Sequence, residues 1–211
     1  MSRVRIVIFA KAPVAGAVKT RLIPALGAQG AANLALRMLK HTITQAVAAG
    51  AGPVELCVSP SPIASVWQSF ALPDNVSWSD QGDGDLGTRM ARAVMRVTEA
   101  GEAIVLMGAD CPELTATQLR HAVDSLQHYD ATMLPTTDGG YVLLGLKRFD
   151  PALFTGIEWS TPSVAAETLS RLAQLGWKVQ HHPAVHDIDR PDDLQYLPPG
   201  WLNLQRAEHG S

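Results

Sequence analysis

Short apolar runs alternate with longer amphipathic stretches along most of this chain. Strands are predicted where about four to eight mostly apolar residues stand together, and helices where apolar positions recur three or four residues apart. The predicted strands are Val4–Ala10, Val54–Ser59, Ala103–Met107, Ala131–Pro135, Tyr141–Leu146 and Lys178–His182. The predicted helices are Gly30–Ala49, Ile63–Phe70, Leu86–Ala100, Thr115–His128, Val164–Leu175 and Pro191–Leu197.

This alternation of strand and helix predicts an α/β fold with a mainly parallel sheet and helices on both faces. Ligands of such folds gather at the carboxyl ends of the strands, so the segments that follow strands are where chemistry is expected. With 211 residues, of which 46% are hydrophobic, the chain can bury one sizeable core. We expect a single domain over residues 1–199 and a frayed tail over 200–211.

The overall composition narrows the classes of partner. A formal net charge of −3 gives the surface as a whole no attraction for nucleic acids or acidic membranes, so any anion site must be local. Cys57 and Cys111 lack the spacing of a metal or redox motif, which favours reduced, packed thiols. The apolar run Val4–Ala10 is too short to cross a bilayer. We expect a cytoplasmic protein without nucleic-acid or membrane partners, and the oligomeric state stays open.

The segment after the first predicted strand carries three cations, Lys11, Lys19 and Arg21. Gly16 between them allows a close approach of the backbone, and loop N–H groups and cationic side chains can then surround phosphate oxygens. The segment is no kinase-type P-loop, because a valine instead of a glycine precedes the Lys-Thr pair. We interpret it as a polyanion site, and a solvated basic turn is the alternative.

Acidic residues follow two further predicted strands. Asp110 comes shortly after Ala103–Met107, and Asp187 and Asp189 follow the last strand. Carboxylates at the carboxyl ends of strands are ligands that Mg²⁺ (or Mn²⁺) prefers. They predict a divalent-metal site that faces the same crevice as the first loop, whereas the alternative makes Asp110 a turn residue in front of a helix.

The stretch from Asp80 to Met90 contains a literal G-x-G-x-x-G. We reject a dinucleotide site, because the preceding segment, 76–79, is short and half polar and the aspartates of the loop would repel a pyrophosphate. We interpret the stretch as a turn that opens a helix. Its backbone and Gln81 are then available to a nucleobase, with Gly87 and Thr88 as further nucleotide-binding candidates, and a plain flexible turn is the alternative.

The segment after the strand Ala131–Pro135 ends in Asp138-Gly139-Gly140. Gly139 and Gly140 let a ligand approach the backbone, and Asp138 is a candidate to hold or deprotonate an acceptor hydroxyl. A hairpin turn explains the same residues and is compatible with that role.

A Trp159-Ser160-Thr161 segment precedes another predicted helix. Ser160 or Thr161 is expected to cap that helix, because a hydroxyl oxygen accepts well from the first free N–H groups. A substrate role for the segment is the lesser alternative.

Six segments in chain order carry a family resemblance: FAKAPVAGAVKTRL, QGDGDLGTRM, GADCPELT, TTDGGYVLLGL, WST and DIDRPDDL. Together they resemble an uncharacterised glycosyltransferase-like family of the nucleotide-diphospho-sugar transferase superfamily, some members of which have been named arsenosugar-biosynthesis glycosyltransferases. They are also similar to phospholactate guanylyltransferases. The resemblance implies a GT-A-like, Rossmann-type three-layer sandwich, in which Lys19 and Arg21 meet phosphates and Asp110, with Asp187 or Asp189, brackets a divalent metal.

Two departures from the family pattern bear on the reaction. Glycosyltransferases of this fold usually carry D-x-D at the metal strand, whereas this chain has Gly108-Ala109-Asp110, with one acid. Nucleotidyltransferases typically pair one such aspartate with a late one, as here, but their usual G-x-G-x-R-M loop is absent from the first strand. We therefore expect nucleotidyl transfer from an NTP to a phosphorylated small molecule. Glycosyl transfer from a nucleotide-sugar, with Asp138 as base, is the alternative, and a non-catalytic nucleotide-binding protein is the second alternative.

Overall fold

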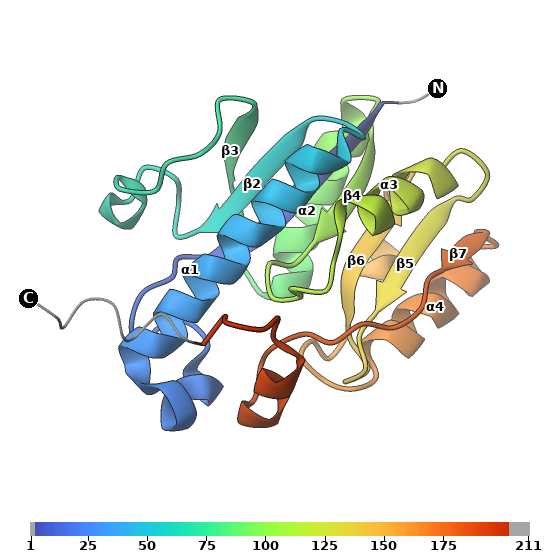
Figure 1. Ribbon diagram of the computed structural model, residues 1–211. Helices are drawn as coiled ribbons and strands as arrows, with labels where there is room; N and C mark the ends of the chain where they lie inside the picture. Colours follow the sequence, from blue (N-terminus) through green and yellow to red (C-terminus); the bar gives the residue numbers. More distant parts are fainter. Residues whose placement is uncertain (1–2, 203–211) are drawn as a thin grey trace, which may run out of the picture.

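The protein, described here as a computed structural model over residues 3–202, is built around one seven-stranded sheet of order β3-β2-β1-β4-β6-β5-β7 (Figure 1). The strands are β1 (Val4–Lys11), β2 (Val54–Ser59), β3 (Val76–Asp80), β4 (Ala103–Met107), β5 (Ala131–Pro135), β6 (Tyr141–Leu146) and β7 (Val179–His181). Neighbouring strands are parallel, except that β6 runs antiparallel to both β4 and β5. The predicted mainly parallel sheet is confirmed.

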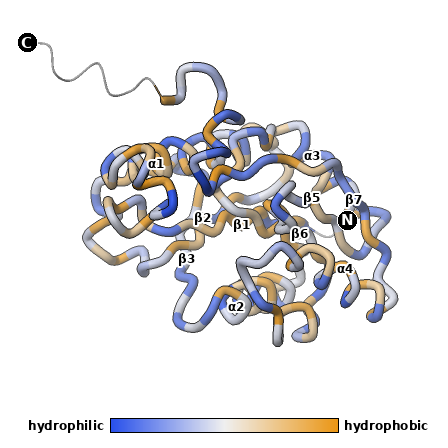
Figure 2. Tube along the Cα trace, turned by 90° about the horizontal axis from the view of Figure 1, so that it is seen from below, coloured by the Kyte–Doolittle hydropathy of each residue, from blue (hydrophilic) through white to orange (hydrophobic). Residues whose placement is uncertain are grey.

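Helices cover both faces of this sheet. The α-helices are α1 (Ile23–Ala49), α2 (Leu86–Glu99), α3 (Ala116–Ser125) and α4 (Val164–Gln174), and the short 3-10 helices are η1 (Thr20–Leu22), η2 (Ser65–Trp67), η3 (Pro151–Leu153) and η4 (Pro191–Tyr196). Helices α1 and α3 lie on one face, and α2 and α4 lie on the other (Figure 2). The arrangement has the three layers that the sequence predicted.

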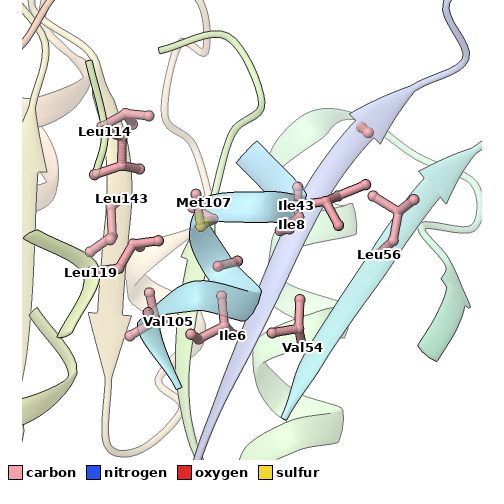
Figure 3. Close-up of a cluster of buried hydrophobic side chains, with 14 of the residues drawn as sticks. Ile6, Ile8, Ile43, Val54, Leu56, Val105, Met107, Leu114, Leu119 and Leu143 are labelled. Carbon is pink, nitrogen blue, oxygen red and sulfur yellow. The ribbon is translucent and has the colours of Figure 1, made fainter. Parts of the chain in front are cut away.

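The central strands are buried on both faces because successive side chains of a strand point in opposite directions. Ile6 and Ile8 of β1 pack with Ile43 of α1 in one core, which Figure 3 shows, whereas Val7 packs in the core under α2 and α4. A third, smaller cluster lies at the edge where the strands end. It joins Leu22, α1 and the late residue Ile188, and so holds two distant segments at the same place.

Three elements differ from the sequence prediction. Residues 76–80 do form a strand, β3, which pairs with β2 at the edge of the sheet; an edge strand tolerates the polar positions that argued against it. The helix predicted over Ile63–Phe70 is only the 3-10 turn η2. Helix α1 covers Ile23–Ala49 instead of starting at Gly30, because it joins two helical stretches across a kink at Gly27, whose φ of 70° and ψ of 166° are not helical.

The ends of other helices also refine the prediction. Thr115 caps α3 in a capping box with Gln118, as an N-terminal threonine should. Ser163 is the N-cap of α4, so the caps predicted at Ser160 and Thr161 were wrong. The segment predicted as a helix from Pro191 is the 3-10 helix η4.

The tail predicted to be frayed is partly docked on α1. The Arg37 guanidinium lies 4.6 Å from the centre of the Trp201 ring and donates to the Trp201 carbonyl oxygen at 2.9 Å. From residue 203 onward, the predicted tail lies outside the described residues. No helix within 3–202 has both the length and the apolar character that crossing a membrane requires.

Candidate active site

The candidate site lies at the carboxyl edge of the sheet, where loops from four strands meet. Lys19 comes from the loop after β1, Asp110 follows β4, and Asp138 lies in the turn between β5 and β6. Asp187 and Asp189 come from the extended segment between β7 and η4, residues 182–190, which we call the late segment. A bridge between Thr136 and Val185 continues the parallel pairing of β5 and β7, which carries this late segment toward the other loops.

Lys19 joins two of these loops through its ammonium group. Its Nζ atom donates to Asp110 Oδ2 at 2.9 Å and lies 3.5 Å from Asp189 Oδ1, and its side chain is only 10% exposed. Burial by itself would lower the Lys19 pKa, but the neighbouring Asp110, Asp189 and Asp187 raise it above its ordinary value. Lys19 is therefore a fixed cation between carboxylates.

Arg21 pairs with the same late segment through Asp189. Burial opposes ionisation of Asp189, yet Lys19 and Arg21 hold its pKa below the usual range. Its backbone N–H donates to Asp193 Oδ2 at 2.9 Å, which fixes the segment to the start of η4. Asp189 is thus fully engaged with protein groups.

Two further ties hold the late segment against the loop after β4. The Ile188 N–H donates to the Asp110 carbonyl at 2.9 Å, and the Ile188 side chain is fully buried. The His186 N–H donates to Glu113 Oε2 at 3.0 Å, and the His186 ring stacks on Tyr196 with centroids 3.7 Å apart. The predicted convergence of Asp110 with the late acids follows from these contacts.

Asp187 is the acid of the late segment that lines a cavity at this edge of the sheet, together with Asp110 and Asp138. Burial, followed by the like charges of Asp138 and Asp110, raises its pKa from 3.8 to about 6. Three carboxylates thus face one space, with more negative charge than Lys19 compensates.

The cavity has a volume of about 340 Å³. Its lining joins charged groups from the segments that follow the strands, here called the mouth, to apolar side chains, here called the wall. Arg21, Asp110, Asp138 and Asp187 contribute the charged groups. Sequence reasoning gave none of the wall a role of its own except Trp159, although Phe9, Leu86, Met90 and Tyr141 all stand in the segments that carry the family resemblance. The wall includes Phe9, Leu86, Met90, Leu106, Tyr141 and Trp159.

The glycine pair after β5 has a local structural role. Asp138 Oδ1 accepts from Thr136 Oγ1 at 2.6 Å and from the Gly140 N–H at 3.0 Å. Gly139 has a φ of 94°, and a Cβ there would overlap the carbonyl of Pro162. Gly139 therefore lets the turn meet the segment before α4, while Gly140 and Asp138 border the cavity.

The G-x-G-x-x-G loop is held by the protein itself. Gln81 is buried, and its amide donates to the carbonyls of Ala10 at 3.1 Å and Cys57 at 3.0 Å, so it differs from the expected free contact to a nucleobase. Asp85 Oδ1 accepts from the Thr88 N–H at 2.8 Å and caps α2. This carboxylate occupies the place where a dinucleotide phosphate would bind, which agrees with our rejection of that motif.

Three more predicted residues have simpler surroundings. A Cβ on Gly87 would overlap the Trp159 indole, so Gly87 serves packing against the cavity wall. Gly16 has a φ of 79° with open space around it, which makes it a turn glycine on an exposed loop. Lys11 is exposed and, with Lys19 and Asp110, lines a second hollow of about 120 Å³.

Neither thiol is suited to nucleophilic chemistry. Burial raises the pKa of Cys111 to about 12 and that of Cys57 to about 11. Both cysteines are free and buried. The packed-thiol interpretation therefore accounts for both residues.

The acidic groups fit a divalent cation that shares its coordination with a substrate. Within residues 3–202 no three His, Cys, Asp or Glu side chains form a ready-made metal cluster. Mg²⁺ commonly takes one or two carboxylates and completes its shell with water and phosphate. Asp110 and Asp187 supply such a pair. The pKa of Asp187 is raised first by burial and then by the like charges of Asp138 and Asp110, which a cation would offset.

Comparison with solved structures supports the same fold. A crystal structure from Desulfovibrio desulfuricans G20, provisionally described as a nucleotide-diphospho-sugar transferase, is 29% identical, with a TM-score of 0.86 over 99% of this chain and 90% of that one. A nucleotidyl transferase from Methanothermobacter (Mth528) is 15% identical, with a TM-score of 0.61 over 96% and 99% of the two chains. The manganese complex of Rv0371c from Mycobacterium tuberculosis H37Rv is 20% identical, with a TM-score of 0.53 over 92% and 97%.

These likenesses confirm the Rossmann-type fold of the nucleotide-diphospho-sugar transferases and the resemblance noted in the sequence. At the level of sequence, one family profile matches residues 42–161, more than half of the chain. That family is described as an uncharacterized protein conserved in bacteria (DUF2064). The chain belongs to the DUF2064 family.

Proposed function

We propose that this protein is a divalent-metal-dependent nucleotidyltransferase that acts on an NTP and a phosphorylated small-molecule acceptor. The observation that carries this proposal is that Asp110 and Asp187 line one cavity while Lys19, just outside its lining, pairs with Asp110 and feels the charge of Asp187, with a single acid after β4 instead of a D-x-D pair. The likeness to a protein described as a nucleotide-diphospho-sugar transferase supports a transferase of this superfamily.

In the proposed reaction, an oxygen of the acceptor phosphate bonds to the α-phosphorus of the NTP. The bond from that phosphorus to the bridging oxygen breaks, and pyrophosphate leaves with the electron pair. Lys19 and Arg21 offset charge on the phosphates. The acceptor is already ionised, so the chain needs no strong base, and Asp138 can remain in the hydrogen bonds of its turn.

Asp110 and Asp187 are the residues that would hold the metal ion. When bound, the ion supplies positive charge toward the triphosphate and the departing pyrophosphate. Asp189 stays with Arg21, and Lys19 keeps the loop after β1 against the loop after β4. Of the two late acids that the resemblance left open, the geometry favours Asp187.

The test uses NTPs labelled at the α-phosphorus and a deproteinised pool of small metabolites. We expect label to appear in a new product, with release of pyrophosphate, only with a divalent metal. Treating the pool with phosphatase should abolish the product, because the acceptor loses its nucleophile. Asp110→Asn should remove activity, whereas Asp192→Asn in η4 should retain it. Label transfer without any pyrophosphate would contradict the proposal.

Glycosyl transfer is the second candidate, favoured by the description of the Desulfovibrio structure and by Asp138 at the cavity mouth. Its products differ, because a nucleotide-sugar donor would release a free nucleoside diphosphate. The same pool with a panel of nucleotide-sugars therefore separates the two reactions. Tight nucleotide binding with neither product would instead indicate a non-catalytic binding protein.

A further inference from the structure

The wall of the cavity that Asp110 and Asp187 line is apolar, unlike its charged mouth. Leu86, the first residue of α2, is 42% exposed although it borders the cavity, whereas Met90 one turn later is nearly buried. Phe9, Tyr141 and Trp159 add three aromatic rings from other parts of the fold. Apolar surface left open beside a functional cavity favours a ligand that covers it.

The protein also holds Trp159 in place at a cost in backbone strain. The next residue, Ser160, has a φ of 66°, in the left-handed region that non-glycine residues rarely adopt. On the other side, Gly87 leaves just enough room for the indole against α2. Strain at a residue that borders a cavity points to a functional requirement for the wall.

The charges at the mouth restrict what enters. Asp110, Asp138 and Asp187 face the cavity, and the cation among its described lining residues, Arg21, is already paired with Asp189. The proposed metal ion would offset the charge of the acceptor's phosphate, but a second acid carried deep into this space would meet like charges without a free partner among those lining residues. An uncharged group meets no such penalty.

We propose that this cavity binds the body of the acceptor, and that this body is uncharged and largely apolar. The inference rests on the proposed transfer function, which leaves the acceptor open. The acceptor's phosphate stays at the mouth near Arg21, and its apolar part lies between Leu86 and Trp159. The cavity of about 340 Å³ is roughly twice the ~150 Å³ of an apolar cavity that holds benzene, which suits one or two rings or an alkyl chain.

The experiment measures the Kd of defined probes by calorimetry in the presence of Mg²⁺. The probes are methyl, propyl and hexyl phosphate, phenyl phosphate, and phosphoglycolate, which carries a second acid. We expect each added methylene to lower the Kd about fourfold, the effect of burying one CH₂ group. Phosphoglycolate should bind more weakly than propyl phosphate. The inference would be overturned if methyl, propyl and hexyl phosphate had the same Kd, or if phosphoglycolate bound as tightly as propyl phosphate.

Two variants of α2 locate the binding. Leu86→Ala should raise the Kd of hexyl phosphate about fivefold and leave that of methyl phosphate within about twofold, because only the long chain reaches the wall. Met95→Ala is the matched control: Met95 lies on the same helix, is 39% exposed, and is absent from the cavity wall. Both changes are at exposed positions and should fold. An equal effect of the two variants would place the probes elsewhere and overturn the inference.

The failures of the two proposals have different signatures. If label is transferred from an NTP but the Kd does not fall with alkyl chain length, the transferase proposal stands and the apolar acceptor is rejected. If the Kd falls with alkyl chain length but no nucleotide is transferred to any acceptor, the apolar ligand pocket stands and the transfer is rejected.

Discussion

Lys19 links the loop after β1 to two acids that lie far away in the sequence. Its contact with Asp110 spans 91 positions, so no local pattern could have revealed it. What the sequence did reveal was the kind of residue and its place after a strand. The sequence assigns Lys19 to phosphate, whereas in the structure it is the partner of two carboxylates.

This pairing gives Lys19 a role in stability as well as in binding. Lys19→Met should lower the unfolding free energy by about 1 kcal/mol, or ~2–4 °C in Tm, because Asp110 and Asp189 lose a shared cation while remaining partly solvated. Lys11→Met is the control, since Lys11 is exposed at the end of β1 and should change little. Chemical denaturation measures both. Equal stability of the two variants would contradict a structural role for Lys19.

Asp187 should make the metal-free protein less stable as the pH rises. Its pKa is about 6 in the fold against 3.8 ordinarily, so the folded protein binds more protons between about pH 4 and 6 and loses stability as the pH rises through that window. Asp187→Asn removes the charge. Discounted for solvent screening, it should stabilise the protein by about 1 kcal/mol at pH 8, with the gain vanishing near pH 4.

Denaturation in EDTA at both pH values tests this expectation. Asp192→Asn controls for the loss of a charge nearby, and should change stability by only a few tenths of a kcal/mol to about 1 kcal/mol at either pH. An Asp187→Asn protein that is less stable than the parent at pH 8 would show that Asp187 makes an attractive contact instead.

At the scale of elements, the sequence predicted the strands with a clear apolar pattern, but it did not predict elements whose conformation depends on contacts with distant residues. All six predicted strands, β1, β2, β4, β5, β6 and β7, appear with ends within a residue of the prediction. The edge strand β3 was missed because its pattern is mixed. Its Trp78 packs with Trp67 and Phe70 in a cluster that turned the predicted helix over Ile63–Phe70 into a short 3-10 turn. Such contacts override local propensity.

The turn between β5 and β6 needs a glycine at position 139 because the segment before α4 packs directly against it. Gly139→Ala should destabilise the protein by about 3 kcal/mol or more, because the methyl group meets both a positive φ and the Pro162 carbonyl. Gly156→Ala is a matched control, with a φ of 70° and open space, and should cost about 1–2 kcal/mol from backbone strain alone. Urea denaturation gives both values. Similar costs would mean that the close approach to Pro162 is readily relaxed.

For the whole molecule, the order of strand and helix was enough to predict a mainly parallel sheet and a site at the carboxyl ends. The hairpin turn considered for Asp138-Gly139-Gly140 agrees with the antiparallel pairing of β5 and β6. The apolar pattern could not predict that β6 would also lie beside β4, between β4 and β5. It also could not predict the cavity wall, which collects single residues from several elements.

Metal and nucleotide should stabilise the protein jointly, because the carboxylate pair needs phosphate oxygens to complete a metal shell. In Asp110→Asn, the Mg²⁺-dependent part of nucleotide stabilisation should be lost. Binding without metal should persist or improve, since the change removes a negative charge and releases Lys19 from its ion pair. Thermal shifts with and without Mg²⁺ measure both effects. An undiminished Mg²⁺ response would reject the proposed metal site.

The late segment is held on the sheet by β7, which has only three residues, and by single contacts such as the bond from the Ile188 N–H to Asp110. Edge elements with few backbone bonds open before the protein unfolds. Detachment of this segment would separate Asp187 and Asp189 from Asp110 while the central strands stay intact. Heat inactivation should therefore precede loss of circular dichroism, and protection of the Ile188 amide from hydrogen exchange becomes a direct gauge of site assembly.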